Sequence, residues 1–156
     1  MRDEREYPDR PWVGIGVVAF DGGSPGGERV LLVQRGKPPR LGLWSLPGGA
    51  QHVGERAEAA ARRELFEETG IEVGPLELAA VVDAISRDAG GAVRFHYTIV
   101  DYCGRRVAGE ARPGDDVSAV AWALPEELPT FDLTPDVLRV ISLARGRLAP
   151  AGPASP

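Results

Sequence analysis

Apolar and β-branched residues gather along the chain into short runs that are separated by Gly- and Pro-rich segments. Two such runs, residues 12–20 and 29–35, predict strands, and the Gly/Pro segment 21–27 between them predicts a hairpin with a long tip. Further runs predict strands at 76–86, 92–102 and 117–123. The pattern therefore indicates a sheet built from strands in both halves of the chain.

Helical patterns fall between and after these strands. Residues 55–69 are dense in Ala, Glu, Arg and Leu and are bracketed by Gly54 and Gly70, which predicts the strongest helix of the chain. A second helix is expected from Thr134, an N-cap candidate followed by Pro135, to about residue 145. This order of elements predicts an α/β fold, an α/β/α sandwich in which helices flank a mixed sheet.

Length and composition favour one folded domain. The chain has 156 residues, of which 43% are hydrophobic and 26% are charged, enough for a single sizeable core. Residues 1–10 are polar and residues 149–156 are rich in Pro, Ala and Gly, so neither end is expected to bury enough apolar surface to order itself. We therefore expect a domain at 11–148 between a flexible N-terminal segment and a flexible tail.

Charge and cysteine content narrow the class of protein. The net charge is −5, so the chain lacks the basic surface that sequence-independent binding to nucleic acid requires. The one cysteine, Cys103, excludes an internal disulfide and fits a reducing compartment. Because residues 1–10 contain no apolar stretch, we expect no signal peptide and no membrane partner. The expectation is a cytoplasmic protein with a small anionic ligand.

The helix at 55–69 carries an acidic cluster. Glu64, Glu67 and Glu68 fall within an arc of roughly 100°, because positions i, i+3 and i+4 share one helical face. The same stripe continues toward the N-terminus as small residues: Ala57, Ala60 and Ala61. A solvated acidic face is the alternative interpretation, but the alanines suit close packing and point the stripe inward. A hard cation such as Mg²⁺, which prefers oxygen ligands, would relieve the repulsion.

The segment from Gly49 to Ile71 resembles the Nudix box, G-x5-E-x7-R-E-U-x-E-E-x-G-U, in which U is a bulky aliphatic residue. It reads Gly49-Ala50-Gln51-His52-Val53-Gly54-Glu55, then seven further residues, then Arg63-Glu64-Leu65-Phe66-Glu67-Glu68-Thr69-Gly70-Ile71. Every specified position is met. Similar flanking patterns are Leu31-Leu32-Val33-Gln34-Arg35, Trp44-Ser45-Leu46-Pro47-Gly48-Gly49 and Val120-Ala121-Trp122. The chain is thus identified by resemblance as a member of the Nudix hydrolase family.

The resemblance implies a role for each residue of the box. The family's principal metal ligands match Glu67 and Glu68, and a further ligand or a catalytic base matches Glu64. The backbone carbonyl of Gly48 would bind the same ion, and a Pro-Gly-Gly turn suits this because Gly permits close approach and φ > 0. Other members pair the residue that matches Arg63 with the one that matches Glu55. The implied cofactor is Mg²⁺, with Mn²⁺ as the alternative.

The base and the substrate contacts stay open. In some family members the base lies on a loop near the final strand, where this chain has carboxylates at Glu110, Asp115 and Asp116. The phosphate-binding candidates are Arg35 and Arg94, although each could be an ordinary surface charge. The side chain of Trp44 lies close enough to the Pro-Gly-Gly segment in sequence to be a substrate contact or a packing residue.

The chain looks like the small bacterial Nudix proteins described as ADP-ribose pyrophosphatases, which yield AMP and ribose 5-phosphate. It lacks the proline that many of these enzymes carry after the box, where it has Ser86-Arg87-Asp88-Ala89. Nucleoside triphosphates are the alternative substrates, and a nucleotide-binding Nudix domain without catalysis is the alternative class. Many relatives form dimers, so the resemblance leaves a homodimer open.

Overall fold

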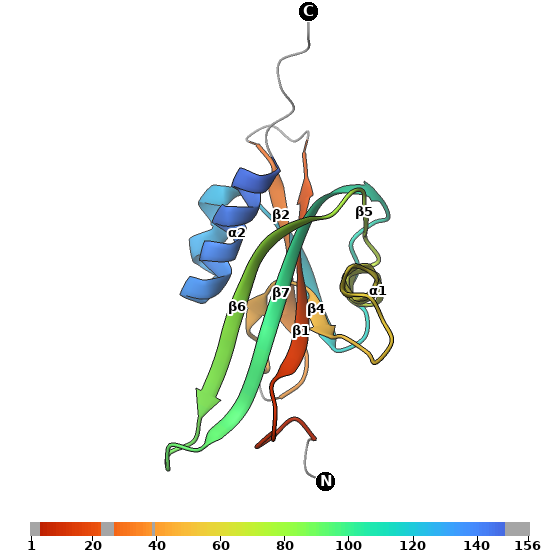
Figure 1. Cartoon of the computed structure of the whole chain (residues 1–156). Helices are drawn as coiled ribbons and strands as arrows, with labels where there is room; N and C mark the ends of the chain where they lie inside the picture. Colours follow the sequence, from red (N-terminus) through yellow and green to blue (C-terminus); the bar gives the residue numbers. More distant parts are fainter. Residues whose placement is uncertain (1–3, 23–26, 39, 149–156) are drawn as a thin grey trace, which may run out of the picture.

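One mixed sheet with a helix on each face is the architecture of the described residues, 4–22, 27–38 and 40–148 of a computed structural model. In chain order the elements are β1 (Trp12–Asp21), β2 (Arg29–Arg35), β3 (Trp44–Ser45), β4 (Gly48–Ala50), α1 (Ala57–Thr69), β5 (Glu72–Val73), β6 (Glu77–Arg87), β7 (Val93–Ala108), β8 (Val117–Ala123), the 3-10 helix η1 (Pro125–Phe131) and α2 (Pro135–Arg147). Figure 1 shows α1 and α2 on opposite sides of the strands. The predicted α/β/α sandwich is confirmed.

The centre of the sheet is the parallel pair β1 and β7, which are in register from Trp12↔Tyr97 to Phe20↔Arg105. The other pairings are antiparallel: β2 and β4 on β1, β3 and β8 on β2, and β5 and β6 on β7. The predicted hairpin of β1 and β2 forms only near its tip, at Phe20↔Val30 and Asp21↔Arg29. Closer to its start, β1 pairs with β4 instead, and this brings the Pro-Gly-Gly segment onto the central strands.

Successive side chains of β1 point to opposite faces of the sheet, so this strand contributes to two hydrophobic clusters. Toward α1, Ile15 and Val17 lie in a cluster with Leu65. Toward α2, Phe20 lies in a cluster with Ile141. Full burial of such a side chain stabilises the fold by about 1.5–3 kcal/mol. The two clusters therefore hold both helices against the sheet.

The helix boundaries follow their capping residues. The first helix begins at Ala57 rather than at residue 55, and it ends as predicted before Gly70, which adopts φ 73° and donates its N–H to the Phe66 carbonyl. At the start of α2, the Thr134 side chain accepts a hydrogen bond from the Val137 N–H, as expected of an N-cap. The short strands β3, β4 and β5 were not predicted, because two or three residues carry no periodic signal.

The described part of the N-terminal segment contacts the β6–β7 hairpin through Tyr7. In its described part, the Tyr7 N–H donates to the Arg94 carbonyl and the Tyr7 hydroxyl donates to Asp88 Oδ2, each at 2.8 Å. Both contacts are hydrogen bonds of Tyr7, which the apolar content of the segment could not reveal. The predicted tail at 149–156 lies outside the described residues. Among the helices of the described part, none is both long and apolar enough to cross a membrane.

Candidate active site

The acidic face of α1 is turned toward the protein. Glu64 is buried, Glu68 is partly buried and Glu67 is exposed, while Arg62 and Phe66 occupy the outer side of the helix. The inward stripe predicted from the alanines is therefore present, since Ala60 and Ala61 are buried with Glu64. The carboxylates are consequently held at the contact between α1 and the sheet.

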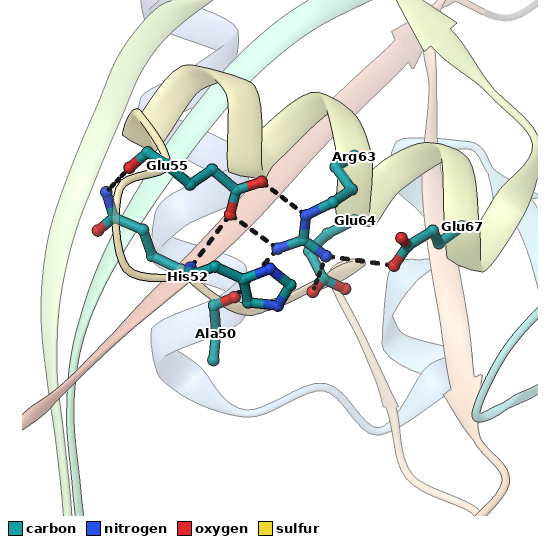
Figure 2. Close-up of polar contacts among 7 residues, drawn as sticks. Ala50, His52, Glu55, Arg63, Glu64 and Glu67 are labelled. Atoms are coloured by element: carbon teal, nitrogen blue, oxygen red, sulfur yellow. Dashed lines mark hydrogen bonds and ion pairs between the residues drawn. The ribbon is translucent and has the colours of Figure 1, made fainter.

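Arg63 ties this face to the loop before the helix, as Figure 2 shows. Its guanidinium donates to both oxygens of Glu55, with Nε to Oε2 at 2.6 Å and Nη2 to Oε1 at 2.9 Å. The same group donates to Glu64 at 2.9 Å, to Glu67 at 3.2 Å and to the Ala50 carbonyl at 3.2 Å. The hydrogen bonds from Arg63 lower the pKa of Glu55 to about 2. One side chain thus fixes loop, helix and β4 relative to one another.

Two glycines of β4 provide the other half of the site. The Gly48 N–H donates to Glu68 Oε1 at 2.7 Å. At Gly49, a Cβ atom would lie 2.5 Å from the Glu64 carboxyl carbon, so only glycine leaves room for this carboxylate. The expectation of a turn with φ > 0 was wrong, because these residues form a strand and neither glycine has a positive φ. Close approach, rather than backbone freedom, is the reason for glycine here.

Burial shapes the electrostatics of these carboxylates. It raises the pKa of Glu68 to about 7 and also raises the pKa of Glu64, and in both cases the negative charge of Asp115 adds to the shift. The loop that carries Asp115 packs on the end of α1, where the Gly114 N–H donates to the Glu68 carbonyl at 2.9 Å. Asp116 instead pairs with Lys37 at 2.7 Å. Of the loop carboxylates considered from sequence, Asp115 is the one coupled to both Glu64 and Glu68, and Glu110 is an exposed residue of the same loop.

The donor set suits a hard divalent cation. It consists of oxygens only, from the carboxylates of Glu64, Glu67 and Glu68 and from the backbone of Gly48, and Mg²⁺ prefers such ligands. In the part of the chain that the structure describes, no three Asp, Glu, His or Cys side chains are grouped so as to enclose an ion. Instead, Glu64 and Glu67 accept hydrogen bonds from the guanidinium of Arg63, and Glu68 accepts one from the Gly48 N–H. These donors hold the three carboxylates near β4.

The residues predicted to contact substrate fall into two groups. Arg35 lines a cavity of about 500 Å³ and its positive charge lowers the pKa of Glu68, so it lies beside the site. Trp44 packs edge-on against Phe131, with ring centroids 5.0 Å apart. Arg94 pairs with Glu6 at 3.5 Å. The structure therefore brings Arg35, but neither Trp44 nor Arg94, to the cavity.

This cavity lies on the α2 side of the sheet and was not foreseen from the sequence. Its lining comes from β1, β2, β3, β4, β6, β7, the first turns of α2 and the side chains of Arg5 and Arg40, and it includes Gly48 and Gly49. Its buried charged residue is Asp101 of β7, which is 4% exposed. The available signal was an acidic residue inside the apolar run Tyr97-Thr98-Ile99-Val100-Asp101-Tyr102-Cys103.

The family profile of the NUDIX domain matches residues 10–143, which is most of the chain. The chain belongs to the Nudix family. This Nudix protein is 40% identical over 122 residues, 78% of its length and 82% of the relative's, to a Mycobacterium tuberculosis protein provisionally named 8-oxo-dGTP diphosphatase 2. It is 35% identical over 113 residues, 72% of its length and 64% of the relative's, to an ADP-ribose pyrophosphatase of Methanocaldococcus jannaschii.

A solved structure gives the same family. The Nudix domain of Shewanella oneidensis NrtR, determined in complex with ADP ribose, superposes with a TM-score of 0.75 and 30% identity over 90% of both chains. Nudix hydrolases act on phosphorus-containing anhydrides and generally use divalent ions such as Mg²⁺. The protein described here is accordingly a pyrophosphohydrolase whose relatives differ in substrate.

Proposed function

We propose that this Nudix protein hydrolyses the pyrophosphate bond of a nucleotide with the help of Mg²⁺, and that Gly48, Glu67 and Glu68 hold the ion, with Glu64 as a further ligand or as the base. The observation that carries the proposal is the contact of two α1 carboxylates with the glycines of β4: Glu68 with the Gly48 N–H and Glu64 with Gly49. Buried carboxylates that share so small a space need positive charge. When bound, the cation would neutralise substrate phosphate charge and acidify a water molecule.

The protein's own residues position and deprotonate this water. Arg63 and Glu55 orient the acidic face, since Arg63 joins Glu55, Glu64 and the Ala50 carbonyl. Glu64 is the proposed base, because Arg63 holds its buried carboxylate against Gly49, next to the proposed ligands of the ion. Asp115 is the competing candidate, because its charge also acts on the buried carboxylates. Arg35, at the edge of the cavity, would bind a phosphate.

The choice of base is tested by comparing the pH profiles of kcat for Glu64→Gln and Asp115→Asn. If Glu64 is the base, its substitution removes the acidic limb of the profile, while Asp115→Asn keeps the limb and changes kcat by less than about 10-fold. Loss of the limb in Asp115→Asn alone would assign the base to the loop.

Two substrate classes have support. ADP-ribose, the substrate expected from the sequence, is supported by the relative named ADP-ribose pyrophosphatase and by the neighbour bound to ADP ribose. Nucleoside triphosphates are supported by the Mycobacterium tuberculosis relative, of which the chain covers 82%. Both classes carry a pyrophosphate linkage next to a nucleoside, so both would use the cation held by the acidic face of α1 in the same way.

A product panel tests the function. Wild-type protein with Mg²⁺ is given ADP-ribose, NDP-sugars, NADH and nucleoside triphosphates, and the products are separated by chromatography. We expect phosphoanhydride cleavage of at least one nucleotide and its loss in excess EDTA. Nucleotide binding by calorimetry without turnover of any panel member would instead support the non-catalytic Nudix domain.

A further inference from the structure

Asp101 lies in a row of residues that crosses the centre of the sheet. Gly48 of β4 pairs with Gly16 of β1, and Gly16 pairs with Asp101 of β7. Adjacent strands are about 4.8 Å apart, so two spacings place the Asp101 backbone roughly 10 Å from that of Gly48. This Gly48–Gly16–Asp101 row therefore runs from the proposed cation site into the cavity.

The Asp101 side chain is buried and has no hydrogen-bond partner among the described residues. Only 4% of the residue is exposed, and burial raises the pKa of its carboxyl to about 6. A carboxylate in such a place costs stability unless donors satisfy its oxygens. The side chain lines the cavity, so a ligand in the cavity can supply these donors.

The glycines of β1 make the hollow in which this carboxylate lies. At Gly16, an added Cβ atom would overlap Asp101 Oδ1, and at Gly14 it would meet the side chains of Ile99 and Tyr97 at 3.4 Å and 3.5 Å. The first part of β1 thus presents backbone instead of side chains to the cavity. Its floor consists of the neighbouring β7 side chains, one aromatic, one aliphatic and one acidic. A flat ring can lie on such a floor with its polar edge toward the acid.

We propose that Asp101 is a specificity-determining residue that accepts two hydrogen bonds from the base of the nucleotide, and that this base carries two adjacent N–H donors, as the guanine edge does. The inference rests on the proposed function and adds the class of base. An ionised carboxylate has two acceptor oxygens side by side and no donor. A guanine edge offers a ring N–H beside an amino group, so both oxygens are satisfied.

Other parts of a nucleotide fit this position less well. An adenine edge places a ring-nitrogen acceptor beside its amino group, and this acceptor would face a carboxylate oxygen, which disfavours adenine. Ribose hydroxyls also donate to carboxylates. However, the sugar adjoins the phosphates, whereas Asp101 is separated from Gly48 by the width of β1. The geometry therefore favours a guanine nucleotide over ADP-ribose.

The test compares GTP with ITP, which lacks only the amino group of guanine. We expect wild-type protein to show a kcat/KM about 10–100-fold higher for GTP than for ITP, because the missing donor leaves one oxygen of Asp101 unpaired. In Asp101→Asn the amide nitrogen faces the guanine amino group, so this preference should disappear or reverse, and ATP should gain relative to GTP. Asp9→Asn makes the same chemical change at an exposed position and should keep the wild-type ratio.

The outcomes distinguish the role of Asp101 from the proposed function. A wild-type protein without preference for GTP over ITP overturns the role of Asp101, as does a preference that persists in Asp101→Asn. The proposal is also overturned if Asp101→Asn lowers kcat/KM for GTP but leaves kcat/KM for dGTP unchanged. In that case the side chain binds the 2′-hydroxyl of the sugar. If wild-type protein cleaves no nucleotide, the proposed function fails. The ratio of the GTP and ITP dissociation constants, measured by calorimetry, then decides the role of Asp101 separately.

Discussion

The two faces of the sheet treat their buried acids in opposite ways. Toward α1, Glu64 accepts from Arg63 and Glu68 accepts from the Gly48 N–H. Toward α2, Asp101 has no such partner in the described part of the chain, although it is only 4% exposed, compared with 9% for Glu64. Both faces border the same strand, β4, which lines the cavity and also contacts the acidic residues of α1.

In the proposed function, this difference separates the residues that act on the reacting bond from the residue that selects the nucleotide. Groups that act on the reacting bond must be held in place before substrate arrives, and partners within the protein achieve this. A group that selects a ligand discriminates best when its hydrogen bonds are completed only by the correct ligand. The acidic face of α1 has the first property and Asp101 has the second.

Glu68→Gln should cause the largest loss of activity. The substitution removes a charge that the cation needs, so kcat/KM should fall on the order of 10³-fold, equivalent to several kcal/mol of charge stabilisation. The cation-free variant should be slightly more stable than wild type above pH 7, because burial raises the pKa of Glu68 to about 7 and the charged form is disfavoured. Steady-state kinetics and thermal unfolding with and without Mg²⁺ measure both effects.

Glu58→Gln is the matched control for this experiment. Glu58 lies on the exposed side of α1, in its first turn, so turnover and stabilisation by Mg²⁺ should stay within about 2-fold of wild type. If Glu68→Gln keeps wild-type turnover and wild-type stabilisation by Mg²⁺, the proposed catalytic role of α1 is wrong.

Gly49→Ala tests whether the close approach of β4 and Glu64 is required. The new Cβ atom would lie 2.5–2.6 Å from the atoms of the Glu64 carboxyl group, so the carboxylate must shift. A displacement of about 1 Å in a catalytic group can cost 10²-fold, and we expect kcat to fall by that order while the fold is retained. Circular dichroism and kinetics on the same preparation separate loss of activity from unfolding.

Gly146→Ala is the corresponding control on α2. An added Cβ atom meets nothing within 4 Å there, and alanine favours a helix by about 0.5–1 kcal/mol over glycine. This variant should keep wild-type kinetics and melt at the same or a higher temperature. Similar kinetics in both glycine variants would show that Glu64 tolerates displacement.

Asp101→Asn should change how stability depends on pH. The pKa of Asp101 is raised from 3.8 to about 6, so the folded state holds the proton more tightly than the unfolded state. The wild type therefore loses stability as pH rises from about 4 to 6 and loses no more above that window. The stability gain of the variant over wild type should be about 2 kcal/mol larger at pH 7.5 than at pH 4.5. Urea unfolding at both pH values measures this difference, and an equal gain at both would show that Asp101 is not destabilised by burial.

The arrangement of the acidic helix was predictable, because it follows from the spacing of residues that are close in sequence. The spacing of Glu64, Glu67 and Glu68 determines their common helical face, and the adjacent alanines determine that it faces inward. Capping residues likewise mark one boundary of each helix: Gly70 marks the end of α1 and Thr134 marks the start of α2. The pairing of Arg63 with Glu55, which the family resemblance implied, is present in the structure.

The sequence by itself thus determined the family, the fold class and the residues of the acidic helix, because helical periodicity and motif spacing connect neighbours along the chain. Tertiary structure alone decided which residues meet across the sheet. The Gly48–Gly16–Asp101 row depends on strand pairings between residues far apart in sequence, and no local pattern encodes that register. For the same reason Arg35 lies at the cavity while Arg94 is bound to Glu6. Tertiary packing determines which side chains come into contact, and this packing exists only in the folded chain.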